Sequence, residues 1–592
     1  MLVDCFNQSF MLGKLSTSQR QAIITLLEKP GKDKTLIENW RPISLNNVDY
    51  KILTKILASR IKPILPSIIH PNQTGYVNGR QIFHSVRLLQ DIMDISVKKN
   101  IHGMLIFIDF LKAFDTLEWD FMFKALEHFN FGNQYIAWVK MIYNDISSSI
   151  INNSVTSPYF SLSRGVRQGD PLSGYLFIIA LEILAQKIRD DKRIEGFKID
   201  NVEIKLTQYV DDMTVVCKDR HSGDALFEIL SKFRSISGLG INVKKSEGMG
   251  IGLDKSTTNK LFGIKWPNDP IKVLGIHLSY DVLAAEKANF DDKIKQLKLQ
   301  LHWWKARDLT LIGRILIAKS IGLSKFIYLA SVIDIPQNIV SEVNAIIYDF
   351  IWKGKKDKVS RKILMQDCDE GGFKMFGFDI IIKSLRVKWI KQYLDQTLQA
   401  DWKQTFESQC QKVNLSLFLR SNFRAIEIKH CNNFYKKAIE DWREVKLELD
   451  SNKEELNGQF IWYNTNITIG RTTVYDESLL KAGLWSVNDL YETGKLIPFH
   501  VWQKRGVDLS SYLTWQGIIR SIPPKWKIAI KSEFPATRNI PPCCVKIGQH
   551  ILNLENMSTK DFKKIHALQH LIEKSRNRIQ FGGKYPEVIF QQ

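Results

Sequence analysis

The sequence predicts an α+β or α/β protein, and three observations indicate this mixed class. Two apolar runs with the composition of strands, at residues 104–110 and 206–216, are separated by long stretches in which apolar residues recur with helical spacing. Two shorter strand-like runs follow, at residues 247–253 and 271–280. After about residue 285 the chain is mostly helical in character and basic. This order predicts a mixed sheet-and-helix region followed by a helical one.

Length and charge restrict the kinds of partner. A chain of 592 residues corresponds to roughly four structural units. Its 83 Lys and Arg against 62 Asp and Glu leave a net charge of +21, which indicates nucleic acid or an anionic membrane surface as partner. No stretch of about 18 residues is free of charge and the N-terminus lacks the order of a signal peptide, so we expect no membrane segment. Seven scattered cysteines favour a reducing intracellular compartment.

The first predicted strand ends in a carboxylate. Asp109 follows a continuous apolar run, where an unpaired charge is expensive. Five residues later Phe114 precedes Asp115, and Asp115 with Glu118 has the spacing of a capping box for the next helix. We therefore predict Asp115 as a helix N-cap and Asp109 as the residue with a chemical role.

A carboxylate pair lies between the two halves of the second apolar run. Asp211 and Asp212 are flanked by strand-like residues, which predicts the turn of a hairpin. Aspartates are common in turns for structural reasons alone. Adjacent carboxylates between hydrophobic strands also repel each other unless a cation binds, and oxygen ligands of this kind suit Mg²⁺ or Mn²⁺.

A glycine-containing loop and a long helix separate these two sites. Gly165 and Gly169 allow a ligand to approach the backbone closely. Asp170 followed by Pro171 predicts an N-cap with proline at the first helical position. The loop also carries side chains that could bind a phosphate group or a nucleic-acid base, namely Arg164, Arg167 and Gln168.

Taken in order, these segments resemble the reverse transcriptase of LINE-type non-LTR retrotransposons. Two N-terminal segments are similar to the fingers of that family, NWRPISLNNVDYKILTKILASRI and QTGYVNGRQ. Motifs A to E of the palm follow as FIDFLKAFD, RGVRQGDPLS, YVDD, SGLGINVKKSE and VLGIHL. The segment LTLIGRILIAKS resembles the thumb of the family and favours it over a group II intron maturase or a telomerase-like enzyme, which share the palm.

The resemblance implies a right-hand polymerase fold in four parts. The expected boundaries are fingers at 1–100, palm at 101–280, thumb and a basic connection at 281–400, and a mainly helical nucleic-acid-binding region at 401–592. Relatives in the family carry an endonuclease and a longer fingers extension ahead of these parts, and we expect both to be absent here. An RNase H carboxylate set is not recognisable.

The resemblance also implies roles for individual residues. The metal-binding positions are Asp109, Phe110, Asp211 and Asp212, for two Mg²⁺ ions with Mn²⁺ as the alternative metal. Lys245 matches the motif D lysine that gives a proton to pyrophosphate, although Lys244 beside it is an alternative. Phe114 matches the aromatic gate that favours dNTPs, or is a plain core aromatic.

Further positions are expected to contact the incoming nucleotide and the nucleic acid. The nucleotide contacts are Arg167, Gln168 and Gly169 from motif B, with Arg41 and Lys34 from the fingers. Arg41 could equally be a solvated loop residue. Residues 301–365 hold eleven Lys and Arg against five Asp and Glu, which favours phosphate binding or, alternatively, a solvated helix face and loop. The residues we select from this segment are Arg314, Lys319, Lys353, Lys355 and Lys356.

The expected function is RNA-directed DNA polymerisation. The chain would extend a DNA primer 3′-end with dNTPs on an RNA template, with target DNA as a further partner, in the nucleus and cytoplasm. The alternative is a catalytically inactive RNA-binding remnant, because the fingers-like text begins within about 30 residues of Met1. The sequence does not predict an oligomeric state.

Overall fold

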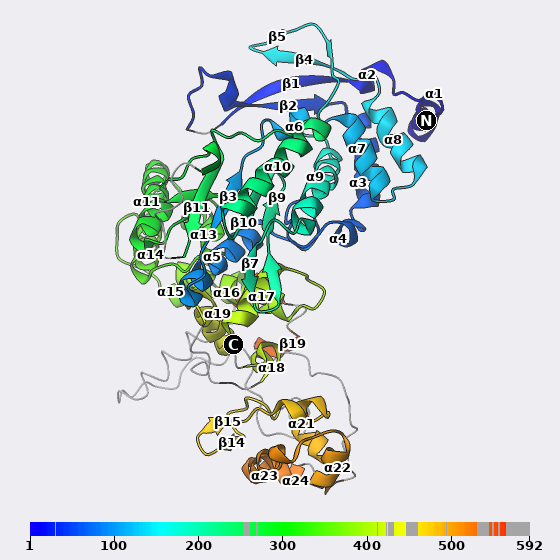
Figure 1. Cartoon of the computed structure of the whole chain (residues 1–592). Coiled ribbons are helices and arrows are strands. Elements are labelled where there is room, and N and C mark those ends of the chain that lie inside the picture. The colour runs from blue at the N-terminus through cyan, green and yellow to red at the C-terminus, as the bar shows by residue number, and fades with distance from the viewer. Residues whose placement is uncertain are drawn as a thin grey trace. The chain divides into compact units, whose positions relative to one another are not determined.

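The computed structural model describes residues 1–29, 31–252, 261–267, 270–410, 413–421, 423, 431–445, 460–492, 494–529, 544–547, 550–553 and 557–563. The chain divides into two compact units (Figure 1). The first unit consists of Met1–Ala285 with Gln399–Thr405, and the second of Glu286–Leu398 with Phe406–Gln592. The four-part division expected from the sequence stays a prediction.

The first unit contains a sheet built from the N-terminal region and a later insertion. Its strands have the order β2-β1-β4-β5, and β6 also pairs with β4. They are β1 (Gln21–Glu28), β2 (Trp40–Asn46), β4 (Ser147–Asn152), β5 (Val155–Thr156) and β6 (Phe160–Ser161). β1 and β2 are antiparallel, with Leu27 opposite Arg41, whereas β1 and β4 are parallel. The basic loop between β1 and β2 is therefore the turn of a long hairpin.

A second, four-stranded sheet holds the two carboxylate sites. Its order is β11-β3-β10-β9, and every neighbouring pair is antiparallel. The strands are β3 (Gly103–Ile108), β9 (Leu206–Tyr209), β10 (Asp212–Cys217) and β11 (Glu247–Ile251). β9 and β10 form the hairpin that the sequence predicts around Asp211. The strands expected near 247–253 and 271–280 are present as β11 and the hairpin of β12 (Ile271–Val273) with β13 (Ile276–Leu278).

Helices pack against this sheet because their apolar residues need cover. α5 (Ile82–Lys99) contacts β9 and β11, α9 (Ser173–Asp190) contacts β9, and α10 (Arg220–Ser237) contacts β10; Figure 1 shows these helices beside the sheet. Buried apolar residues of β9, β10, α9 and α10 belong to one hydrophobic core. The unit also contains a two-stranded hairpin, β7 (Phe197–Ile199) with β8 (Val202–Ile204). Its first two helices are α1 (Leu2–Leu12) and α2 (Thr17–Arg20). Besides α5, α9 and α10, the remaining helices of the unit are α3 (Val48–Ile61), α4 (Leu65–Ile68), α6 (Ala113–Thr116), α7 (Trp119–His128) and α8 (Asn133–Tyr143). The mixture of antiparallel sheet and helix confirms the α+β class.

Two predicted helix starts are wrong. Asp115 lies inside the short helix α6, and the N-cap of α7 is Glu118. The helix breaks between them because Leu117 is extended and its carbonyl oxygen accepts a hydrogen bond from the Gly165 N–H (2.7 Å). Likewise α9 begins at Ser173, two residues after Pro171, although a carboxylate oxygen of Asp170 still accepts from the Leu172 N–H (3.2 Å).

The second unit is mainly helical, as the sequence predicts for this part of the chain. Its longer helices are α11 (Val282–Lys305, which begins in the first unit), α12 (Leu311–Ile317), the π-helix η3 (Ala318–Leu323), α13 (Ser324–Ala330), α14 (Gln337–Ile351), α16 (Phe378–Leu394), α17 (Asp401–Gln409, which also begins in the first unit), α19 (Asn433–Val445) and α23 (Tyr512–Ser521). The shorter ones are α15 (Arg361–Met365), α18 (Leu415–Arg420), α21 (Glu477–Lys481), α22 (Phe499–Lys504) and α24 (Pro524–Ala529). Two-stranded hairpins are formed by β14 (Thr468–Ile469) with β15 (Thr472–Thr473), β16 (Tyr491–Glu492) with β17 (Lys495–Leu496), and β18 (Cys544–Ile547) with β19 (His550–Asn553). Across the described ranges, no helix combines the length and apolar character needed to cross a membrane.

Candidate active site

Three aspartates lie at one end of two neighbouring strands in the first unit. Asp109 directly follows β3, Asp211 lies in the β9–β10 turn, and Asp212 is the first residue of β10. Met213 pairs with Ile108, so Asp212 and Asp109 follow at the same end of this antiparallel pair. The strand end and the hairpin turn that the sequence predicts therefore lie at one edge of the sheet.

The three carboxylates influence one another electrostatically. Burial raises the pKa of Asp211, and the negative charge of Asp109 raises it further. The pKa of Asp212 is raised to about 6, first by loss of hydration and then by the charges of Asp211 and Asp109. A bound cation would relieve this repulsion.

The donor set fits a divalent cation by its chemistry. Carboxylate oxygens are the ligands that Mg²⁺ and Mn²⁺ prefer. Among the residues that the structure describes, however, no three or more His, Cys, Asp or Glu side chains are grouped so that they could hold a metal ion. Phe110 is 6% exposed and its backbone bridges to Ile241. The metal-binding assignment of Asp109, Phe110, Asp211 and Asp212 stays a prediction.

The segment that carries Lys245 runs directly beside Asp109. The Asp109 N–H donates to Ser246 Oγ (3.2 Å), and its carbonyl oxygen accepts from the Asn242 N–H (2.6 Å). Lys244 and Lys245 are both exposed on the turn between these two contacts. This turn fixes the backbone around Asp109, while both lysines stay candidates for the proton donor.

Lys29 is a candidate site residue that sequence reasoning missed, although its ammonium donates to the Glu38 carbonyl (2.8 Å). Its pKa is lowered by burial and by the positive charges of Lys245 and Arg41, while the negative charge of Asp109 opposes the shift. Lys29, Arg41 and Lys245 thus form a cationic group on the same side as Asp109. Lys34, by contrast, pairs with Glu28 (2.6 Å) and is largely exposed. The only signal for Lys29 was its position at the start of the basic loop.

The motif B loop is tied to the two neighbouring segments. The Val166 N–H donates to the Phe114 carbonyl (2.6 Å), and the indole N–H of Trp119 donates to the Gly165 carbonyl (2.7 Å). On the other side, the Ser44 N–H donates to the Gln168 carbonyl (2.8 Å). Gly169 has a φ of 104°, which only glycine adopts readily. The side chain of Gln168 is half-buried and keeps access to the surface.

Arg167 corrects an expectation from the sequence. We predicted it on the loop side, in contact with the nucleotide, but it is 4% exposed. Its guanidinium donates to the carbonyl oxygens of Arg20 and Ser147 and lies over the ring of Tyr50, 5.2 Å from the centroid. Arg167 therefore joins α2, β4 and α3 to the motif B loop, and the nucleotide contact is not retained.

Phe114 is half-buried, with one face on the core. Its ring stacks on that of Phe177 at a centroid distance of 4.7 Å and an interplanar angle of 11°. This packing fixes the ring firmly, which both a gate residue and a core residue require. The gate assignment stays a prediction.

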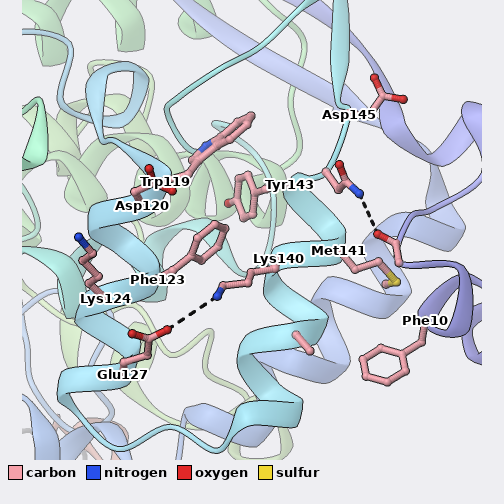
Figure 2. A pocket seen from close by; sticks show the side chains of 13 residues that line it. Phe10, Trp119, Asp120, Phe123, Lys124, Glu127, Lys140, Met141, Tyr143 and Asp145 are labelled. Carbon is pink, nitrogen blue, oxygen red and sulfur yellow. Dashed lines mark hydrogen bonds and ion pairs between the residues drawn. The ribbon is translucent and has the colours of Figure 1, made fainter.

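A cavity of about 720 Å³ lies elsewhere in the first unit, between α1, α7 and α8. Figure 2 shows that aromatic side chains such as Phe123 and Tyr143 line it together with the ion pair of Lys140 and Glu127. None of the three aspartates at the sheet edge lines this cavity. It is therefore separate from the candidate active site.

The basic residues selected for nucleic-acid binding all lie in the second unit, namely Arg314, Lys319, Lys353, Lys355 and Lys356. Lys319 donates to a backbone carbonyl (3.4 Å) and Lys353 pairs with Asp308 (3.1 Å). Lys355 and Lys356 are exposed. Their role in nucleic-acid binding stays a prediction.

Comparison with known proteins gives matches in the region of this site. Residues 27–278 match the family model described as reverse transcriptase (RNA-dependent DNA polymerase). The chain is 31% identical over 402 residues to the transposon TX1 uncharacterized 149 kDa protein of Xenopus laevis, covering 67% of this chain and 30% of that protein. It is 25% identical to the retrovirus-related Pol polyprotein from type-1 retrotransposable element R2 of Popillia japonica, covering 38% of this chain and 32% of that protein.

The chain therefore spans about a third of the length of these relatives. Among solved structures, telomerase from Candida tropicalis in complex with a TWJ fragment of telomeric RNA aligns with 68% of this chain and 66% of its own. The sequence identity is 13% and the TM-score 0.37, so this likeness says nothing about individual residues.

Proposed function

Because residues 27–278 form a reverse transcriptase domain of the LINE-type non-LTR retrotransposon family, we propose that this chain extends the 3′-end of a DNA primer with dNTPs on an RNA template. The domain has the right-hand polymerase fold of that family. The observation that carries the proposal is the convergence of Asp109, Asp211 and Asp212 at one sheet edge, where burial first and then the charge of Asp109 raise the carboxyl pKa values of Asp211 and Asp212.

The aspartates would hold two divalent cations, which we propose to be Mg²⁺. When bound, such ions activate the primer 3′-hydroxyl and neutralise charge on the departing pyrophosphate. Lys29 and Arg41 would bind the triphosphate, which the clustering of their charges with Lys245 near Asp109 supports. We do not include Lys34, because it pairs with Glu28.

Other residues would orient the reactants. Lys245 would protonate the pyrophosphate leaving group, and the half-buried ring of Phe114 would pack against the sugar where a 2′-hydroxyl would otherwise sit. Gln168 and Gly169 would contact the nucleotide and the template from the motif B loop. The basic residues of the second unit would neutralise phosphates of the template and primer without sequence preference.

The test is primer extension on poly(rA)/oligo(dT) with dTTP and Mg²⁺. We expect extension by the wild type, and a loss of about a hundred- to a thousandfold in Asp211→Asn, since single electrostatic contributions in active sites are worth about that much in rate. Asp190→Asn is the matched control, because Asp190 also belongs to an aspartate doublet but is exposed at the end of α9. Extension that survives Asp211→Asn contradicts the proposal. RNA binding without extension under Mg²⁺ or Mn²⁺ favours the inactive RNA-binding alternative.

A further inference from the structure

Val210 adopts a backbone conformation that is unfavourable for its residue type. It precedes Asp211 in the β9–β10 turn, has a φ of 58° and is 8% exposed. Two-residue hairpin turns with a positive φ at this position usually have glycine there, and a β-branched residue is an outlier. Strain of this kind persists only where the surrounding structure stabilises it, and it is common at functional sites.

The side chain of Gln73 supplies that stabilisation. Its Oε1 accepts from the Val210 N–H (2.9 Å), and its Nε2 donates to the Val210 carbonyl (3.1 Å). Oε1 also accepts from the Gly75 N–H (2.8 Å), and Nε2 also donates to Oε1 of Gln208 (3.4 Å). Gln73 is 1% exposed, so this amide uses its full hydrogen-bonding capacity inside the protein. Both polar groups of the strained residue are therefore held by one side chain.

The segment that carries Gln73 is itself fixed against β9. The Gln208 N–H donates to the Asn72 carbonyl (2.8 Å), and the Thr74 N–H donates to the Gln208 carbonyl (2.9 Å). The guanidinium of Arg80 donates to the carbonyls of His70 (2.6 Å) and Gln73 (2.9 Å). The amide of Gln73 thus approaches the turn from a rigid base.

The close approach also explains a glycine in the same segment. A Cβ on Gly75 would lie 2.5 Å from Cγ2 of Val210 and 2.8 Å from its nitrogen. Any larger residue would push the segment away from the turn and lengthen the Gln73 hydrogen bonds. The sequence QTGY, which resembles part of the fingers, therefore also contacts the turn that carries Asp211.

We propose that Gln73 is a positioning residue: its amide holds Val210 at a positive φ and thereby sets the direction in which Asp211 leaves the hairpin turn. This inference rests on the proposed polymerase function. Without the amide, Val210 relaxes toward a negative φ, and the backbone that carries Asp211 rotates with it. Gln73 is buried and contacts the turn through Val210, so its effect on Asp211 passes through that residue.

The experiment compares Gln73→Met with Gln19→Met. Gln73→Met keeps the length of the side chain but removes all four hydrogen bonds of the amide, including the two to Val210. Gln19 is an equally buried amide of the same unit, bonded to Asp49 (2.6 Å) and absent from the hairpin contacts. Each variant is made with Val210 and with Val210→Gly, because glycine adopts a positive φ without strain. The measurements are kcat and KM for dTTP on poly(rA)/oligo(dT), and hydrogen exchange of the peptide 206–217.

Each lost hydrogen bond changes an equilibrium by roughly two- to thirteenfold, so Gln73→Met should lower kcat by about 5- to 150-fold. KM for dTTP should change little. In the Val210→Gly background the loss should shrink to about threefold or less, since no strain then needs support. Exchange of 206–217 should accelerate in Gln73→Met but not in Gln19→Met.

Three results would overturn the inference: a Gln73→Met kcat close to that of the wild type, an equal loss in both backgrounds, or unchanged exchange of 206–217. An equal loss in both backgrounds identifies a merely structural amide. If the wild type does not extend primers, the proposed function fails, and hydrogen exchange still decides whether Gln73 holds the turn.

Discussion

Gly165 should tolerate no side chain, because its position combines a left-handed backbone with a close backbone neighbour. Its φ is 84°, and a Cβ would lie 2.7 Å from the Asp115 carbonyl oxygen, 2.9 Å from the carbonyl carbon and 3.0 Å from Cα. Gly13 has a similar φ of 69° but nothing within 4 Å of the added atom. Both glycines belong to the first unit, so Gly13→Ala is a matched control for Gly165→Ala.

The expected magnitudes differ because only one site has a clash. A left-handed conformation costs alanine about 1–2 kcal/mol, and this is the whole expected effect of Gly13→Ala. At Gly165 the three contacting atoms are backbone, so α6 must shift, which adds about 1–3 kcal/mol by analogy with overpacked sites. We therefore expect Gly165→Ala to lower the free energy of unfolding of the first unit by about 2–5 kcal/mol.

Native-state hydrogen exchange of the buried strand β3 measures this free energy within the first unit alone, which avoids the two-unit transition of a thermal scan. Since every 1.4 kcal/mol is tenfold in an equilibrium constant, the added 1–3 kcal/mol should make β3 exchange about 5- to 140-fold faster in Gly165→Ala than in Gly13→Ala. Equal exchange in the two variants would refute the reasoning. It would show that α6 and the motif B loop separate without cost.

Three further predictions concern single side chains. Burial raises the pKa of Asp401 to about 6, so the folded unit keeps a proton that the unfolded chain releases near pH 4. The contribution of Asp401 to the free energy of unfolding should therefore fall by at most about 3 kcal/mol as pH rises from about 4 to 6, in addition to the similar contribution of Asp212. Asp401→Asn should remove the part due to Asp401, so that the fall in urea titrations is smaller than in the wild type; an equal fall in both proteins contradicts the assignment. Phe114→Ala should raise the ratio of rUTP to dTTP incorporation by about tenfold, whereas Phe177→Ala should only destabilise the protein; an unchanged ratio in Phe114→Ala identifies a plain core residue. Lys29→Met should raise KM for dTTP by about tenfold or more, because a charged contact to the triphosphate is lost. Lys32→Met, on the same loop, should leave KM unaltered. Equal KM values in both variants would remove Lys29 from the nucleotide site.

Local patterns were reliable wherever a segment buries its own apolar residues. The apolar run before Asp109 is a strand, and the two apolar segments on either side of Asp211 form a hairpin. Both were predictable because alternating or continuous apolar residues indicate directly which segments are buried in the core. The helix start at Asp115 was wrong for a reason outside that segment. A hydrogen bond from Gly165, nearly fifty residues away, holds Leu117 extended and ends the turn.

The same distinction applies to the candidate site. The sequence by itself determined the α+β class, the strand ends that carry the carboxylates, and, through the order of its motifs, the reverse transcriptase family. Only the tertiary structure decided that Arg167 is a buried link between α2, β4 and α3, that the charges of Lys29 and Arg41 lie near Asp109, and that Gln73 supports the strained Val210. Composition and periodicity indicate which residues of each segment are buried and which are exposed to solvent. The contacts between side chains of distant segments depend on the packing of the whole unit. There, one hydrogen bond or one turn decides whether a residue is buried or exposed.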